Sequence, residues 1–144
     1  MENELLHYEN ICFRRDGRHI LDNVNWHIEK GENWALLGLN GAGKSTLLSM
    51  IPAYQIPTTG ILRVFGHEFG KYAWPKIKSR LGFVSSALGQ FQSTLDKQVV
   101  EDVVISGAFS SIGIYQDVAP EVRERGMQLF YDFGLGHLEG HRFY

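Results

Sequence analysis

The sequence predicts an α/β fold in which an antiparallel meander precedes a buried strand, a glycine-rich loop and a helix. Residues 5–13 and 20–28 are rich in β-forming residues, and an Asp-Gly turn at 16–17 joins them. Residues 34–37 are wholly apolar, which is typical of a strand buried on both faces of a sheet. From Thr94 onward the pattern becomes helical, so we expect the start of a helical subdomain after the core.

The elements that follow the glycine-rich loop are predicted from local signals. Residues 44–51 read as a helix, which Pro52 ends because proline cannot continue a helical hydrogen-bond ladder. A strand is predicted over residues 61–65, after a turn at 57–60. A further short strand is predicted over residues 81–84.

The C-terminal part of the sequence predicts two helices. Thr94 is a suitable N-cap for a helix over residues 95–105. A second helix begins at Pro120, where a first turn accepts proline, and Gly134 is suited to end it in a left-handed conformation. The sequence therefore predicts two regions, a core with the glycine-rich loop over 1–92 and the beginning of a helical subdomain over 93–144.

Composition and charge restrict the class of protein. The chain has 144 residues, a net charge of −2 and interspersed acidic and basic residues, so it lacks the basic stripe expected of a nucleic-acid binder. No run approaches the ~18 apolar residues of a membrane span, and the acidic start of the chain does not resemble a signal peptide. We therefore expect a cytoplasmic protein. The single cysteine, Cys12, is expected to be a small core residue.

The histidines do not predict a metal site by their spacing. Of the six, His137 and His141 are separated by four residues, but glycines flank them near the end of the chain. Surface or core positions are the better interpretation for all six histidines.

The glycine-rich loop has the pattern of a phosphate-binding loop. Backbone N–H groups that point into one concavity, together with a helix N-terminus, can hold a polyphosphate. Glycines let the backbone approach the phosphates closely. The predicted cofactor-binding residues of the loop are Gly38, Leu39, Asn40, Gly41, Ala42, Gly43, Lys44, Ser45 and Thr46. The pattern and its place between a strand and a helix predict binding of ATP or GTP.

Within the loop, three side chains have predicted chemical roles. Lys44 supplies a cation for the β- and γ-phosphates and is the predicted catalytic residue. The Ser45 hydroxyl is suited to ligate Mg²⁺, and Thr46 can reach an α-phosphate oxygen. The expected cofactors are therefore ATP and Mg²⁺.

Around the loop, the sequence resembles the ATP-binding subunits of ABC transporters. The resemblance rests on residues 20–24 and 28–32 before the loop, on Leu37–Leu48, and on 57–60 and 64–66 after it. It implies a P-loop NTPase core with an N-terminal antiparallel meander and a helical subdomain. Residues 81–86 and 106–113 resemble a branch of the family associated with molybdate or iron-type transport.

Two positions depart from the family's pattern. Arg15 stands where the family usually has an aromatic residue that stacks on adenine, and a guanidinium plane can also stack on a base. Tyr8 and Phe13 lie nearby, but strand alternation places them in the core. Ser86 stands where the family usually has a glutamine that contacts Mg²⁺, so Ser45 and Ser86 are the predicted metal ligands.

The resemblance also implies elements that do not occur before Tyr144. In the family, a Ser-Gly-rich signature loop, a second strand with an aspartate and a catalytic glutamate, and a switch histidine follow the helical segment. We therefore expect a C-terminally truncated ATPase, the N-terminal part of a longer parent that hydrolyses ATP to power solute transport. By itself, the chain is expected to bind nucleotide and to hydrolyse it poorly. Its phosphate-loop strand is expected to expose apolar surface, because it lacks sheet neighbours.

The implied partners are a second ATPase subunit, as in a homodimer, and a transmembrane permease subunit that would hold the protein at the inner face of the membrane. Two alternatives stay open at this stage. One is a soluble ABC-type binding module or regulator without a transport role. The other is a different P-loop NTPase or kinase, although kinases usually begin with the phosphate-loop strand itself.

Overall fold

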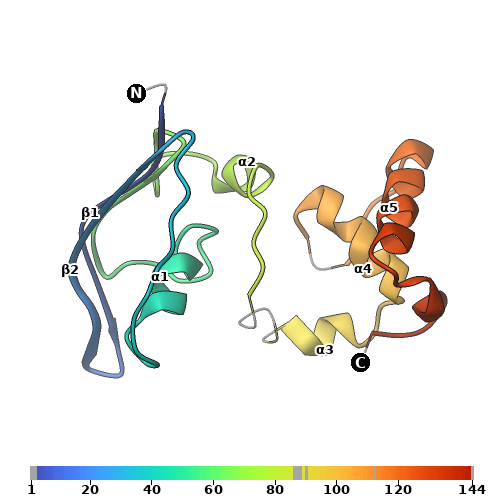
Figure 1. Ribbon diagram of the computed structural model, residues 1–144, viewed down its shortest axis with the longest axis horizontal. Coiled ribbons are helices and arrows are strands. Elements are labelled where there is room, and N and C mark those ends of the chain that lie inside the picture. Colours follow the sequence, from blue (N-terminus) through green and yellow to red (C-terminus); the bar gives the residue numbers. More distant parts are fainter. Residues whose placement is uncertain (1–2, 86–88, 90, 112, 144) are drawn as a thin grey trace. The chain divides into compact units, whose positions relative to one another are not determined.

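The computed structural model describes residues 3–85, 89, 91–111 and 113–143. The chain forms two compact units, Met1–Phe83 and Val84–Tyr144, which Figure 1 shows in blue to green and in yellow to red. The first unit contains a β-sheet and two helices, and the second is helical. Each has buried apolar side chains of its own. The predicted division between residues 92 and 93 stays a prediction.

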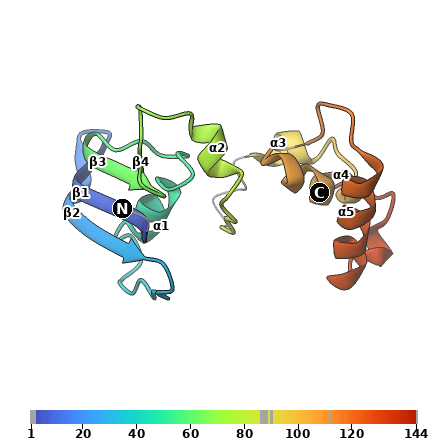
Figure 2. The ribbon, with the colours of Figure 1, turned by 90° about the horizontal axis from the view of Figure 1, so that it is seen from above.

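The sheet of the first unit is a four-stranded antiparallel sheet with the order β2-β1-β3-β4 (Figure 2). Its strands are β1 (Glu4–Arg15), β2 (Arg18–Glu29), β3 (Thr59–Val64) and β4 (His67–Glu68). The predicted meander and the predicted strand before Gly66 are therefore confirmed. The strands extend beyond the predicted limits, because backbone pairing continues into the polar residues next to the turns.

Tight turns connect the paired strands. Asp16 and Gly17 both have positive φ, 51° and 75°, as a two-residue hairpin turn of the right twist requires. Gly60 has φ of 102°, and a Cβ there would lie 2.5 Å from the carbonyl oxygen of Asn10. Glycine at this position therefore lets β3 approach β1 closely.

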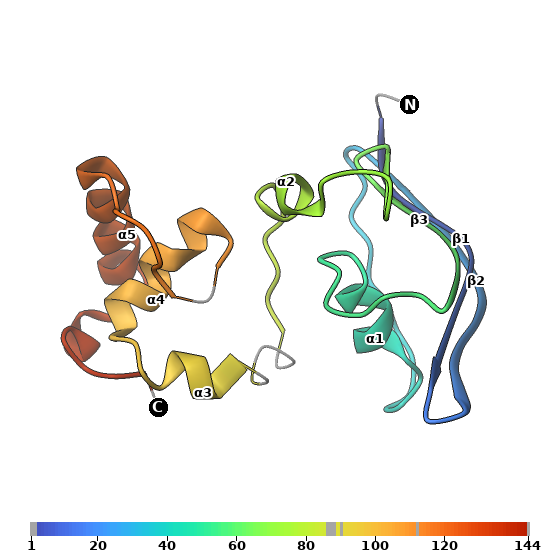
Figure 3. The same cartoon turned by 180° about the vertical axis from the view of Figure 1, so that it is seen from behind.

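The core of the first unit lies between one face of the sheet and two short helices, α1 (Lys44–Ser49) and α2 (Trp74–Lys78). Figure 3 shows α1 against one face of the sheet. Strand alternation puts Leu6 and Tyr8 on this face, where both are buried. The Tyr8 hydroxyl donates a hydrogen bond of 2.8 Å to the Leu47 carbonyl and so ties β1 to α1.

The two short apolar segments expected as strands, residues 34–37 and 81–84, are not strands in the structure. The side chain of Leu37 is 88% exposed and that of Val84 is 99% exposed. A parallel strand needs neighbours on both sides, and no described strand lies beside either segment. The strand prediction is wrong here, whereas the expected exposure of apolar surface next to the phosphate loop is confirmed.

Among its described residues, the second unit contains three helices, α3 (Gln92–Leu95), α4 (Val100–Ser106) and α5 (Pro120–Asp132), with short 3₁₀ turns η2 (Gly107–Phe109) and η3 (Gly136–Leu138). α4 crosses α5 closely at Gly126, where a Cβ would lie 2.5 Å from Cγ1 of Ile105. Phe130 is fully buried. Gly134 follows α5 with φ of 73°, which confirms the predicted left-handed end.

The single helix predicted over residues 95–105 is interrupted in the structure. α3 ends at Leu95, and α4 begins only at Val100. Between them, Val99 forms a β-bridge with Arg142, and the Val100 amide donates to the His141 carbonyl at 3.0 Å. The end of the chain therefore takes up backbone groups that a continuous helix would have used.

The predicted helix over residues 44–51 ends earlier, at Ser49, where the Tyr54 and Gln55 amides both donate to the Ser49 carbonyl. In the part of the chain that the structure describes, no helix is long and apolar enough to cross a bilayer.

Candidate phosphate-binding site

The phosphate loop leads into α1 through two glycines in the left-handed region. Gly41 has φ of 82° and Gly43 has φ of 85°, conformations that residues with a Cβ rarely adopt. A Cβ at Gly43 would lie 2.8 Å from Cδ2 of Leu21 and 3.1 Å from the Ile20 carbonyl oxygen. Glycine is therefore needed at residue 43 also because the loop packs against β2.

The backbone amides at the start of α1 remain open to a ligand. The Leu47 amide donates to the Gly43 carbonyl at 2.8 Å, which closes the first turn of the helix. The amides of Lys44, Ser45 and Thr46 precede that bond and have no intrahelical acceptor, as at the start of any helix. No side chain caps this end. These donors are the type of group that holds a phosphate.

The Lys44 ammonium lies folded against the loop. Its Nζ donates to the Gly38 carbonyl at 2.7 Å and to the Leu39 carbonyl at 2.8 Å. These two bonds satisfy part of the hydrogen-bonding capacity of the ammonium without neutralising its charge. A bound polyphosphate would compete with two neutral acceptors for this cation.

A cavity of about 400 Å³ opens beside the loop. Most of the predicted loop residues line it, and the sheet contributes Arg15 and Ile20 to its wall. The loop residues that line the cavity are Asn40, Gly41, Ala42, Gly43, Lys44, Ser45 and Thr46. Arg15 and Lys44 make the lining cationic, and no carboxylate is among the lining residues that the structure describes. The cavity therefore has the charge that suits a polyphosphate.

Arg15 is held in place by neighbouring side chains. Its Nη2 donates to Oε1 of Gln55 at 3.1 Å, and its Cζ lies 5.6 Å from the centroid of the Phe13 ring. Phe13 and Tyr8 are buried, so they belong to the core as predicted. The cavity thus receives a guanidinium from the sheet at the position predicted to contact the base.

The remaining predicted positions differ in where they lie. Gly38 and Leu39 do not line the cavity but contribute the two carbonyls that hold Lys44. Ser86, the second predicted metal ligand, lies outside the described residues. Ile20 and Gln55 were not predicted as site residues. The hairpin register could have indicated Ile20, whereas no local signal connects Gln55 with Arg15.

Comparison with known proteins gives a clear family. Residues 21–142 match the ABC transporter family. The ABC transporter ATP-binding protein YlmA of Bacillus subtilis (strain 168), itself uncharacterized, is 41% identical over 131 residues, which cover 90% of this chain and 49% of that protein. A putative ABC transporter ATP-binding protein of Streptococcus mutans is 31% identical over 136 residues, with 94% and 52% covered. The chain thus spans about half the length of these curated relatives.

Solved structures show the same fold. A dimeric bacterial ABC transporter cassette superposes with a TM-score of 0.72 at 21% identity, over 96% of this chain and 61% of that one. A dimeric cassette in a post-hydrolysis state with bound ADP and phosphate gives a TM-score of 0.71 at 22% identity. The first unit and the helical segment are therefore parts of the P-loop NTPase fold of these cassettes. With this fold, a phosphate loop beside a cationic cavity and a family match over most of its length, the chain belongs to the ABC transporter family, among its ATP-binding proteins.

Proposed function

We propose that this chain binds ATP together with Mg²⁺ at the phosphate loop. The observation that carries the proposal is the cationic cavity beside the loop, which brings Arg15 to Lys44 and to the start of α1. The triphosphate would lie against the amides of residues 43–46, with Lys44 at the β- and γ-phosphates. Arg15 would contact the adenine, either by stacking or through its edge.

The described lining of the cavity offers Mg²⁺ one side-chain ligand of the predicted pair, Ser45. The Ser45 hydroxyl belongs to the cavity lining and offers a neutral oxygen, which Mg²⁺ accepts when substrate phosphates supply further oxygens. Ser86 stays the second predicted metal ligand. When bound, Mg²⁺ would offset the negative charge of the phosphate oxygens.

In the whole protein, we propose that ATP hydrolysis powers the movement of a solute. The relatives are ABC transporter ATP-binding proteins, which supports a permease as a partner. The similar solved cassettes are dimeric, which supports a paired ATPase subunit. Membership of the ABC family also removes support from the kinase alternative. The molybdate or iron-type branch stays a prediction, since the residues that select a solute would lie in the permease.

A binding titration tests the nucleotide site. We expect a fluorescent ATP analogue to bind with Mg²⁺, and Lys44→Ala to weaken its affinity about 10–100-fold, because a charge-assisted hydrogen bond is worth about 1.5–3 kcal/mol. Lys30→Ala, at an exposed lysine in the turn after β2, is the matched control and should leave the affinity unchanged. Equal affinity of Lys44→Ala and the unmodified chain would contradict the proposal.

A turnover assay separates binding from hydrolysis. The described residues that line the cavity include no carboxylate to activate water, so we propose that this chain by itself turns over ATP slowly or not at all. Clear Mg²⁺-dependent turnover that Lys44→Ala abolishes would contradict this part of the proposal and leave the binding part intact.

Capture of a soluble partner that depends on ATP, with no permease involved, would favour a regulator over a transport subunit.

A further inference from the structure

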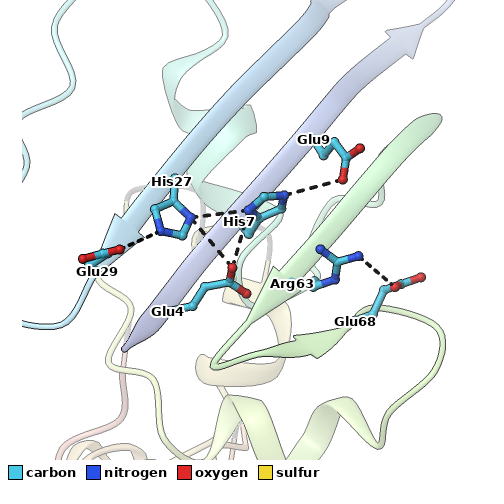
Figure 4. A network of polar contacts seen from close by, with 7 residues as sticks. All are labelled: Glu4, His7, Glu9, His27, Glu29, Arg63 and Glu68. Atoms are coloured by element: carbon cyan, nitrogen blue, oxygen red, sulfur yellow. Dashed lines mark hydrogen bonds and ion pairs between the residues drawn. The ribbon is translucent and has the colours of Figure 1, made fainter. Parts of the chain in front are cut away.

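Three potential ligand atoms meet on the outer face of the sheet, away from the phosphate loop. Nδ1 of His7 lies 3.4 Å from Nδ1 of His27 and 3.5 Å from Oε2 of Glu4. Nδ1 of His27 lies 3.8 Å from the same carboxylate oxygen. Figure 4 shows the three side chains converging from β1 and β2. His7 and His27 are directly paired across these strands.

The triangle has the size of one face of a tetrahedral metal site. Zn²⁺ binds imidazole nitrogen and carboxylate oxygen at about 2.0–2.2 Å, so neighbouring ligand atoms of a tetrahedron are about 3.3–3.6 Å apart. Two of the three observed separations agree with this spacing. The third, 3.8 Å, needs only a small rotation of the Glu4 side chain.

The other nitrogen of each imidazole faces a second carboxylate. Nε2 of His27 lies 3.4 Å from Oε1 of Glu29, and Nε2 of His7 lies 3.6 Å from Oε2 of Glu9. This is the usual surrounding of a metal-binding histidine, in which a carboxylate holds the tautomer that presents the free lone pair to the ion. If both Nε2 atoms carry the proton, the Nδ1 lone pairs and the Glu4 carboxylate all face one another, and a cation would relieve their repulsion.

The charges around the cluster also favour a cation. Glu4, Glu9 and Glu29 place three carboxylates about the two imidazoles. Arg63 is the partner of His7 on β3, but its Nη2 lies 3.5 Å from Oε2 of Glu68 and is directed to that carboxylate (Figure 4). The balance of charge beside the imidazoles is therefore negative.

The cluster is accessible and separate from the nucleotide site. Strand alternation puts His7 on the face opposite the buried Leu6 and Tyr8, which face α1. The side chains of His7 and His27 are 28% and 45% exposed. Both residues line a depression of about 350 Å³, together with Tyr8, Glu9, Asn25 and Trp26. An ion can reach this face without disturbing the core.

We propose that Glu4, His7 and His27 bind one divalent transition-metal ion, of which Zn²⁺ is the best match, through Oε2 and the two Nδ1 atoms. A water molecule or a partner's side chain completes the tetrahedron. Two nitrogen donors select a borderline ion such as Zn²⁺ over Mg²⁺, so this site differs in chemistry from the phosphate loop. The bound ion joins β1 to β2 beyond their backbone hydrogen bonds.

The test is a metal titration of the chelator-treated full chain without nucleotide. We expect one equivalent of Co²⁺ to give the visible absorption of tetrahedral coordination, and Zn²⁺ to displace it. His7→Gln and His27→Gln should each weaken Zn²⁺ binding at least about 100-fold, and Glu29→Gln about 10–100-fold. His19→Gln is the matched control, because His19 lies on the same hairpin with a single carboxylate, Asp22, at 3.9 Å. It should bind Zn²⁺ as the unmodified chain does.

Two results would overturn the proposal. One is the absence of stoichiometric Co²⁺ or Zn²⁺ binding at micromolar metal. The other is an unchanged Zn²⁺ affinity in His7→Gln, which would place the ion elsewhere. Circular dichroism of the metal-free variants shows whether they fold, and nitrogen NMR of the unmodified chain gives an independent measurement. Coordination shifts the two Nδ1 resonances, and shifts confined to Nε2 or to other histidines would contradict the assignment.

Discussion

The β1–β2 hairpin and the segment over residues 34–37 both have apolar, strand-like sequences, yet only the hairpin forms strands. In the hairpin, Ile11 is fully buried, and each strand finds its partner across a tight turn. In the other segment, Leu37 is 88% exposed and has no described strand beside it. The difference shows that a strand sequence becomes a strand only where a partner is available. Antiparallel partners are local, whereas parallel partners come from distant parts of a chain.

The largest expected loss of stability comes from a cavity among the buried residues of the β1–β2 hairpin. Ile11→Ala should lower the free energy of unfolding of the first unit by about 2–5 kcal/mol, because it removes buried methyl groups and leaves a void. Urea unfolding followed by circular dichroism measures this loss. Leu37→Ala removes a similar apolar volume where nothing packs, and its cost should be within about 0.5 kcal/mol. Equal losses of stability in the two variants would show that residues 34–37 are packed as well as the hairpin, which would contradict the comparison.

A smaller effect is expected at the hydrogen bond between the sheet and α1. Tyr8→Phe removes the hydroxyl that donates to the Leu47 carbonyl, which keeps only the Met50 amide at 3.3 Å, and should cost about 0.5–1.5 kcal/mol at neutral pH. Burial raises the pKa of the Tyr8 phenol above its usual range. The neutral phenol is therefore favoured in the folded state, and its contribution, complete below a pH of about 10, is lost as the pH rises further.

Unfolding measured between about pH 9 and 11 checks the sign of this pH dependence. The stability of Tyr8→Phe should fall less steeply with rising pH than that of the unmodified chain. Tyr115→Phe, at a side chain that is 74% exposed, is the control and should follow the unmodified chain. A steeper fall in Tyr8→Phe would contradict the prediction.

The smallest effect on stability is expected at the exposed residues Leu37 and Leu39. Their substitution should change the self-association of the chain more than its stability. Leu37→Ser combined with Leu39→Ser should change the free energy of unfolding by no more than about 0.5 kcal/mol, since the two side chains are 88% and 85% exposed. Because exposed apolar patches promote self-association, the double variant should stay monomeric at higher concentration. Analytical sedimentation measures the self-association. Unchanged self-association of the double variant would mean that this segment does not mediate contacts between copies of the chain.

Much of the fold could be predicted from local signals. The Asp16-Gly17 turn, the strands around it, the helix after the phosphate loop and the helix from Pro120 to Asp132 all follow from turn chemistry, periodicity and capping. The interruption of the helix predicted over 95–105 could not be predicted, because it depends on pairing with Arg142 near the end of the chain. Local propensity does not report such distant contacts.

The candidate sites divide in the same way. The phosphate loop is contiguous in sequence, so its pattern could be read directly, and the cavity brings most of its residues together with Arg15. The cluster of Glu4, His7 and His27 could not be predicted from spacing. The register set by Arg15 and Arg18 next to the turn would place His7 opposite Trp26, and irregularities along the pair shift it by one residue to His27. Such shifts have no clear signal in a single sequence.

The position of Trp34 gives the molecule an optical reporter for its unpaired segment. Trp34 is 57% exposed and begins the apolar residues before the phosphate loop. Its ring packs edge-on against that of Trp26, with 5.9 Å between the ring centroids. Trp74, at 7% exposure, lies in the core. A partner that covers residues 34–37 should move the emission of Trp34, and of Trp26 packed against it, to shorter wavelength, over the background of the buried Trp74. Trp34 fluorescence can therefore report when a strand pairs with residues 34–37.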